Sequence, residues 1–370
     1  MFIPTVGLCG VVMAGGVRRR NNGGGMTPQS SDFSLNRPGV LIAALPAVLG
    51  FVPEKSLVLV TVDRGEMGCV MRVDLSDELT EAVEHIAEVA AGAGPDATIA
   101  VIVDDDGAGC RMCNDDYRHL AASLAMTLAE QGIELLAAHV VDRVAAGGRW
   151  HCADGCGNSG TVEDPSASPL AVAAVLDGRR LYTRRADLQE VIAVADPARS
   201  EALAAAIGDC DADRPDTEVR RDVEMAMAAA VYVADGQTLT DDTAARLACA
   251  LTDPLVRDTL YALAVGEDAG QAESLWAELA RTLPEPWRVE ALVLLAFSAY
   301  ARGDGPLAGV SLDAALRCDD THRMAGMLDT ALQSGMRPEQ IRDLAVTGYR
   351  LAKRLGVRLP ARRAFGRRAG

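Results

Sequence analysis

The first half of the chain alternates between short apolar runs and longer amphipathic stretches. The β-branched runs SLVLVTVD (56–63) and CVMRVDL (69–75) flank the turn RGEMG, which predicts a β-hairpin. Two further apolar runs, 97–104 and 133–142, have the length and composition of buried strands. Between them, 115–132 repeats its apolar positions at helical spacing and ends at a glycine. Strands and helices therefore alternate along this half.

The order of these segments predicts an α/β layer domain. A helix capped by Ser76 separates the hairpin from the third strand, and the 115–132 helix separates the third from the fourth. A helical crossover of this kind joins parallel strands, so the third and fourth strands should form a central parallel pair. The residues RWHC (149–152) are expected to return antiparallel across the AAGG turn. The result is a mixed sheet with flanking helices.

The second half has a helical period throughout. After Pro169, and from Arg220 to about Leu355, the periodic segments are helical and no strand is predicted. The stretch 291–316 resembles one tetratricopeptide-type unit, with small residues at helix contacts and a Gly-Asp turn. A repeat stack needs about three units, so an ordinary bundle stays an equal alternative. We expect an all-α helical domain with tetratricopeptide-like texture.

The two patterns, together with the chain ends, predict four parts. They are a disordered N-terminal extension (1–25), an α/β domain (26–165), a helical domain (166–349) and a basic C-terminal tail (350–370). This division also fits the length of 370 residues, which exceeds what one core usually supports.

Charge changes the expected partners. The chain has 36 basic and 52 acidic residues and a net charge of −16. The extension carries three arginines and the tail carries eight basic residues, so the body between them is more acidic still. An acidic body repels nucleic acid and anionic membrane surfaces, which leaves the tail as the one segment suited to nucleic acid. We expect no membrane association.

The expected compartment is the cytoplasm. Arg18 to Arg20 follow the apolar run near the N-terminus, whereas a secretory signal places its positive residues first. The chain has nine cysteines, an odd number that does not suggest a disulfide framework. We therefore expect reduced thiols in a cytoplasmic protein.

Two cysteine pairs are the most distinctive candidate chemistry. Cys110 and Cys113 are spaced Cys-x-x-Cys, and Cys152 and Cys156 are spaced Cys-x-x-x-Cys in a glycine-rich loop. Two close pairs separated by a fold segment can build a four-sulfur zinc site, and His151 can replace one thiolate. A redox pair and unligated thiols are the alternatives. Zinc is the one cofactor that this pattern suggests.

Acidic residues close several predicted strands, where ligand sites of α/β sheets tend to form. Candidate ligand-binding residues at these strand ends are Asp104, Asp105, Asp142, Arg149 and Trp150. Clustered carboxylates can hold Mg²⁺ with a phosphate ligand, although aspartate also caps turns in this position. No serine, histidine or metal-protease signature accompanies them, so the sequence identifies no catalytic residue.

Three stretches resemble a family. RPGVLIAALPAVLGFVPEKSLVLVTV (37–62), SPLAVAAVLDGRRLYTRRADL (168–188) and RVEALVLLAFSAYARGDGPLAGVSLDAAL (288–316) are similar to an actinobacterial family known as domain of unknown function 4192. The resemblance spans most of 35–335 and is most specific in the first stretch. It implies an apolar helix ahead of the first strand. It implies no activity, because the family has none assigned.

These observations predict a cytoplasmic binding or regulatory module. Its helical half would contact a protein partner, and the loops at the sheet edge would take a small molecule. The alternative is a metal-assisted hydrolase or phosphate-ester enzyme that uses Asp104, Asp105 and Asp142 at that edge.

Overall fold

The computed structural model describes most of the chain. The described residues are 36–76, 79–92, 94–176, 179–208 and 215–363. The expected extension (1–25) and the end of the expected tail lie outside them. Within these ranges, no helix is both long and apolar enough to cross a membrane. The chain divides into two compact units, the first ending at Arg185.

A six-stranded mixed sheet forms the centre of the first unit, in the order β2-β1-β3-β4-β5-β6. The strands are β1 (Ser56–Asp63), β2 (Glu66–Asp74), β3 (Ala97–Val103), β4 (Glu134–Val141), β5 (Arg149–Cys152) and β6 (Ser159–Thr161). β3 and β4 pair in parallel, and the other neighbours pair antiparallel. The predicted hairpin, central parallel pair and antiparallel return are therefore confirmed.

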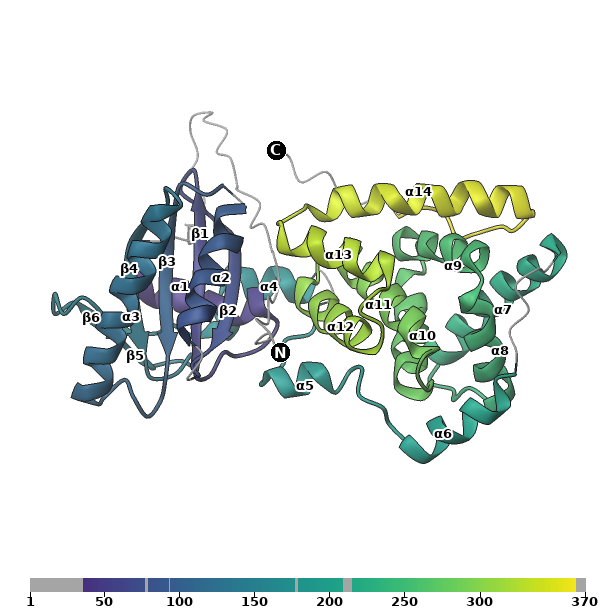
Figure 1. Cartoon of the computed structure of the whole chain (residues 1–370), viewed down its shortest axis with the longest axis horizontal. Coiled ribbons are helices and arrows are strands. Elements are labelled where there is room, and N and C mark those ends of the chain that lie inside the picture. The colour runs from purple at the N-terminus through teal and green to yellow at the C-terminus, as the bar shows by residue number, and fades with distance from the viewer. Residues whose placement is uncertain (1–35, 77–78, 93, 177–178, 209–214, 364–370) are drawn as a thin grey trace, which may run out of the picture. The chain divides into compact units, whose positions relative to one another are not determined.

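Helices cover both faces of this sheet. The helices of the first unit are α1 (Pro38–Leu49), α2 (Leu79–Gly92), α3 (Arg111–Glu130) and α4 (Pro169–Leu176). α2 and α3 lie on one face, here called the α2/α3 face, and α1 lies on the other, the α1 face (Figure 1). Leu59, Ile102 and Val140 point into the core of the α2/α3 face. Because side chains alternate along a strand, His139 and Val141 point to the α1 face.

The first unit extends further along the chain than the sequence suggested, to Arg185 instead of residue 165. The reason is the tertiary packing of α4 and Tyr182 against the rest of the first unit. α4 packs against α1, and Tyr182 forms a parallel bridge with Phe51 that includes a 2.7 Å hydrogen bond to the Gly50 carbonyl. The pattern after Pro169 correctly predicts a helix, but a local pattern cannot tell which core a helix joins.

α3 begins earlier than the apolar period suggested. We expected it to start at residue 115, and it starts at Arg111 with Cys110 at its N-cap. The Asn114 N–H donates to the Cys110 carbonyl at 3.0 Å, which opens the helical ladder. Asn114, Asp115 and Asp116 interrupt the apolar period between this first turn and the rest of the helix. This shift moves both cysteines of the first pair from a loop to the N-terminal turn of a helix.

The second unit is helical, as predicted. Its helices are α5 (Arg185–Gln189), α6 (Pro197–Ala206), α7 (Asp216–Ala234), α8 (Asp241–Thr252), α9 (Pro254–Leu260), α10 (Ala269–Thr282), α11 (Arg288–Arg302), α12 (Gly305–Cys318), α13 (Arg323–Gln333) and α14 (Pro338–Leu355). α14 includes residues 350–355, so the expected tail begins inside a helix. Short 3₁₀ helices occur at Pro165–Ala167 and Tyr261–Val265.

α11 is the central helix of this unit. It packs against α10, α12 and α14, and residues 291–301 are all buried. α11 and α12 form the helix pair that resembled a tetratricopeptide unit. Gly303 turns the chain with φ of 88°, and Asp304 caps α12 by accepting from the Leu307 N–H at 3.2 Å. A helix apolar on all sides is typical of a bundle centre.

The expectation of reduced thiols is wrong at one position. Cys249 on α8 is disulfide-bonded. The free cysteines among the described residues are Cys69, Cys110, Cys113, Cys152, Cys156 and Cys318. Both cysteine pairs singled out from the sequence are therefore present as thiols.

Gly348 on α14 allows a close approach of two helices. A Cβ at this position would lie 2.7 Å from the Thr259 carbonyl oxygen and 2.8 Å from the Ala262 Cβ. We expect Gly348→Ala to lower the free energy of unfolding by about 1 to 3 kcal/mol, because backbone must move. Gly326→Ala on α13 is the matched control, since nothing lies within 4 Å of its Cβ, and it should stabilise by up to about 1 kcal/mol. Urea denaturation of both variants checks this, and equal effects would contradict it.

Candidate functional site

Cys110 and Cys113 form a dithiol at the N-terminus of α3. Cys110 occupies the N-cap and Cys113 the third helical position, so one helical turn brings the two sulfurs together. The Cys110 sulfur lies near the Cys113 thiol and near the backbone N–H groups of Met112 and Cys113, which interact with it electrostatically. Both cysteines are half-buried, and Met112 between them is 76% exposed. The pair is therefore open to a reactant.

The two thiols at the helix terminus have pKa values shifted in opposite directions. The backbone N–H and thiol of Cys113, with the Met112 N–H, lower the pKa of Cys110, because they stabilise its thiolate. The hydrogen bond to Cys110 raises the pKa of Cys113, and burial and the negative charges of Cys110 and Asp104 raise it further. Cys110 is thus the better nucleophile, and Cys113 keeps its proton longer.

A buried carboxylate lies beside the dithiol. Asp104 ends β3, is 9% exposed, and accepts hydrogen bonds from the Tyr117 hydroxyl and, at 2.5 Å, from Lys55 Nζ. Burial alone would raise its pKa, but the hydrogen bonds from Lys55, Tyr117 and the Gly107 N–H outweigh burial and lower it. A Cβ on Gly107 would collide with the Tyr117 hydroxyl and the Asp104 carboxylate, so glycine is required there.

The other strand-end carboxylates surround the same lysine. Asp104, Asp105 and Asp106 bring their oxygens within 4.8 Å of one another, a spacing that suits a cation. Lys55 Nζ lies 2.8 Å from Asp106 and 3.5 Å from Asp105. Lys55 has φ of 43°, a left-handed conformation that is unusual outside glycine. An ammonium group already supplies positive charge to these carboxylates.

Asp142 and the backbone of Arg149 take part in the turn after β4. Asp142 Oδ1 accepts from the backbone N–H groups of Arg143 at 2.6 Å and Arg149 at 2.8 Å. This arrangement closes the tight turn between β4 and β5. No described contact joins Asp142 to the carboxylates around Lys55.

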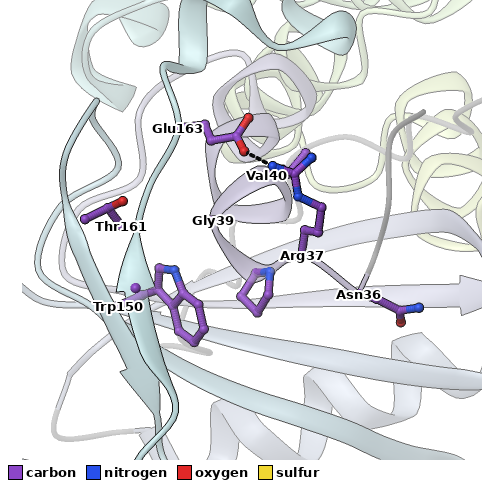
Figure 2. Close-up of a pocket in the computed structure, with 9 residues that line it drawn as sticks. Asn36, Arg37, Gly39, Val40, Trp150, Thr161 and Glu163 are labelled. Atoms are coloured by element: carbon purple, nitrogen blue, oxygen red, sulfur yellow. Dashed lines mark hydrogen bonds and ion pairs between the residues drawn. The ribbon is translucent and has the colours of Figure 1, made fainter. Parts of the chain in front are cut away.

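Trp150 lies on the α1 face, away from Asp104. It lines a shallow recess with Gly39 of α1 and Gly160 of β6, and an Arg37–Glu163 ion pair of 2.5 Å lies beside it (Figure 2). A Cβ on Gly160 would be about 3 Å from the indole ring, so the strand pair needs glycine to seat it. The recess is therefore a packing feature at the sheet edge.

The two cysteine pairs do not form one ligand group among the described residues. Cys113 packs against the core of the α2/α3 face, whereas Cys152 pairs with His139 across β4 and β5 and points to the α1 face. The structure therefore does not bring the four predicted zinc ligands together. Instead, Cys152, Cys156 and Asp154 have ligand atoms within 4.8 Å of one another.

His151, which sequence analysis considered as a replacement ligand, supports the dithiol helix. It points to the α2/α3 face, and its Nε2 lies 2.8 Å from Asn114 Oδ1. Asn114 in turn donates through Nδ2 to the Cys110 carbonyl at 2.8 Å. The histidine therefore contacts the first turn of α3.

Sequence reasoning missed three residues of these clusters. Lys55 and Tyr117 contact Asp104, and His139 contacts Cys152 with Nδ1 and Sγ 3.7 Å apart. A signal existed for Tyr117, because it follows Cys113 by four residues and so shares its helix face. Lys55 and His139 reach their partners through strand pairing that a local pattern does not reveal.

Asp104 is expected to contribute to stability mainly above its own pKa. Asp104→Asn should lower the free energy of unfolding at pH 7 by about 1 to 3 kcal/mol, because charged hydrogen bonds are lost around a buried group. The folded-state pKa lies below the ordinary value, so this contribution is present above about pH 4 and disappears as the pH falls through the folded pKa.

Thermal unfolding of wild type and Asp104→Asn between pH 7 and pH 3 measures this difference. The matched control is Asp105→Asn, whose side chain is 71% exposed and should change stability by less than about 0.5 kcal/mol. A pH-independent difference for Asp104→Asn would contradict the account.

Comparison with known proteins identifies one family. A family model described as Domain of unknown function (DUF4192) matches residues 38–339. No curated protein and no solved structure matches the chain. The match covers the sheet and most of the helical unit, so it agrees with the resemblance seen in the sequence.

Proposed function

Since the chain belongs to the DUF4192 family, whose description assigns no function, we propose from its geometry that it is a thiol-responsive regulatory module. Its reactive group is the Cys110–Cys113 dithiol, which exchanges with disulfides of small molecules or proteins. The observation that carries this proposal is the position of both cysteines in the first turn of α3, with one at the N-cap.

Three features of the site support thiol–disulfide exchange. The helix terminus offers backbone N–H groups that stabilise a thiolate on Cys110. The second thiol lies one helical turn from Cys110 and interacts with it electrostatically, so it can resolve a mixed disulfide. The exposed Met112 side chain gives an approaching disulfide an apolar contact beside the nucleophile.

The reaction balances without further components. The Cys110 thiolate attacks one sulfur of a disulfide R–S–S–R, forms a mixed disulfide and releases RS⁻. Cys113 then loses its proton and attacks the Cys110 sulfur, which closes the Cys110–Cys113 disulfide and releases a second RS⁻. Two protein thiols are oxidised, and one external disulfide is reduced to two thiols.

Disulfide mapping tests this proposal. The full chain is reduced, freed of reductant, incubated with oxidised glutathione, quenched by alkylation and analysed by peptide mass spectrometry. The expected product is a Cys110–Cys113 disulfide formed ahead of modification at Cys156 or Cys318. The proposal fails if glutathione adducts spread evenly over the exposed thiols and no Cys110–Cys113 disulfide forms.

The helical domain would supply the regulatory output by binding a protein partner in the cytoplasm. Val231 and Tyr232 on α7, each 46% exposed, support this part because exposed apolar side chains favour protein contacts. Tyr232→Ser should weaken a partner that copurifies at equal stoichiometry, and retention of that partner would count against α7 as the contact.

The alternative, a metal-assisted hydrolase using Asp104, Asp105 and Asp142, has less support. Lys55 already forms ion pairs with the first two carboxylates, and Asp142 is engaged by backbone N–H groups. Neither arrangement leaves these oxygens poised around a common substrate.

A further inference from the structure

We propose that Cys152, Cys156, Asp154 and His139 form a structural zinc site at the edge of the sheet, separate from the Cys110–Cys113 dithiol. The ligand would be a soft divalent cation, Zn²⁺, held by two thiolates, one carboxylate and one imidazole. Binding expels the two thiol protons, and no electron is transferred. The inference does not depend on the proposed thiol exchange.

A tight turn brings three of the four ligands together. After β5 the chain reverses at Gly155 and Gly157, with φ of 77° and 86°. The Asp154 carboxylate accepts from the Cys156 N–H at 2.9 Å, which fixes the turn. The ligand atoms of Cys152, Asp154 and Cys156 consequently lie within 4.8 Å of one another.

A buried histidine supplies the fourth ligand from a different strand. His139 on β4 is 4% exposed, pairs with Cys152 in the sheet and places Nδ1 3.7 Å from the Cys152 sulfur. Its ring packs edge-on against Trp150, with centroids 5.3 Å apart, so its orientation is fixed.

The spacing of His139 Nδ1 and Cys152 Sγ fits a tetrahedral ion, whereas His139 lies outside the group of three ligand atoms that are all within 4.8 Å of one another, so the exposed Asp154 and Cys156 side chains must turn toward it on binding. Zn–S and Zn–N bonds of about 2.3 and 2.05 Å at the tetrahedral angle place sulfur and nitrogen about 3.6 Å apart. The observed Nδ1–Sγ distance of 3.7 Å matches this value. Four protein ligands leave no position for water, so the ion would hold the loop to β4 and have no catalytic role.

Titration with Co²⁺ and Zn²⁺ tests this site in the full chain. The protein is stripped with a chelator, kept reduced with a phosphine and titrated with Co²⁺, whose visible spectrum reports tetrahedral thiolate ligation. Zn²⁺ competition then gives the affinity. We expect one ion per chain and a stability gain on Zn²⁺ binding, since binding energy is coupled to the fold.

Matched variants identify the ligands. Cys156 is exposed, so Cys156→Ser should fold normally yet weaken Zn²⁺ binding by more than about tenfold. His139→Gln should weaken Zn²⁺ binding as well. Because His139 is buried, this variant is compared with wild type only if it unfolds cooperatively. The control is Cys110→Ser/Cys113→Ser, which should bind Zn²⁺ as wild type does.

Three results would overturn the proposal. Absence of a tetrahedral cobalt spectrum at one equivalent would show that the cluster does not bind the ion. Loss of binding in both Cys156→Ser and the Cys110/Cys113 double variant would instead assign the metal to all four cysteines. Unchanged affinity in Cys156→Ser would place the ion elsewhere.

Discussion

Cys110→Ser is expected to slow the reaction of the reduced protein with a small disulfide by about 100-fold or more, because it removes the thiolate that attacks first. Stopped-flow measurement with a chromogenic disulfide gives the rate. In wild type this rate should rise with pH and reach half its maximum at a lower pH than an ordinary thiol does, because the backbone N–H and thiol of Cys113, with the Met112 N–H, lower the pKa of Cys110.

Cys113→Ser separates attack from resolution. This variant should still form a mixed disulfide at Cys110, but the adduct should persist, since no second thiol is present to displace it. At low pH, Cys110 of this variant should also attack the disulfide more slowly than Cys110 of wild type, because the Cys113 thiol helps to stabilise the Cys110 thiolate. Cys318→Ser is the control and should react as wild type does. Equal rates in Cys110→Ser and wild type would contradict the assignment of the nucleophile.

Leu295→Ala should lower the free energy of unfolding by about 2 to 5 kcal/mol. Leu295 is fully buried on α11, the helix that contacts α10, α12 and α14, so truncation leaves a cavity at the centre of the helical unit. Loss of this size is a large part of the stability of a typical domain. Chemical denaturation followed by the tryptophan signal of buried Trp276 measures the change.

The matched control for Leu295→Ala is Leu344→Ala on α14, whose side chain is 49% exposed. It should change the free energy of unfolding by less than about 0.5 kcal/mol. An effect of that small size in Leu295→Ala would mean that the packing of α11 is not as described.

The apolar pattern was sufficient to predict the sheet and the helical unit, because both depend on which face of each element is buried. Ile102 on β3 and Val140 on β4 face one core, and the residues next to them along each strand face the other, as alternation requires. β6 escaped prediction because Ser-Gly-Thr has no apolar alternation. It is held in the sheet by pairing with β5 and by the fit of Gly160 against Trp150.

The candidate site could be predicted only in part. The spacing of Cys110 and Cys113 identifies a dithiol, but the polar residues 114–116 interrupt the apolar period of α3, so the pattern does not reveal that the two cysteines begin a helix. Lys55 reaches Asp104 only because β1 and β3 are neighbours, and the charge of Lys55 then changes the use of the carboxylates. Likewise, the register of β4 with β5 decides that Cys152 meets His139 and not the first cysteine pair.

A redox titration of the dithiol tests the central claim most directly. The full chain is equilibrated in glutathione buffers of graded potential, trapped by differential alkylation and read at each cysteine by mass spectrometry. The account predicts a two-electron transition shared by Cys110 and Cys113, with a midpoint between about −300 and −120 mV, the range of exchangeable protein dithiols. If Cys110 and Cys113 stay reduced across that range, or oxidise independently of each other, the dithiol is not a redox centre.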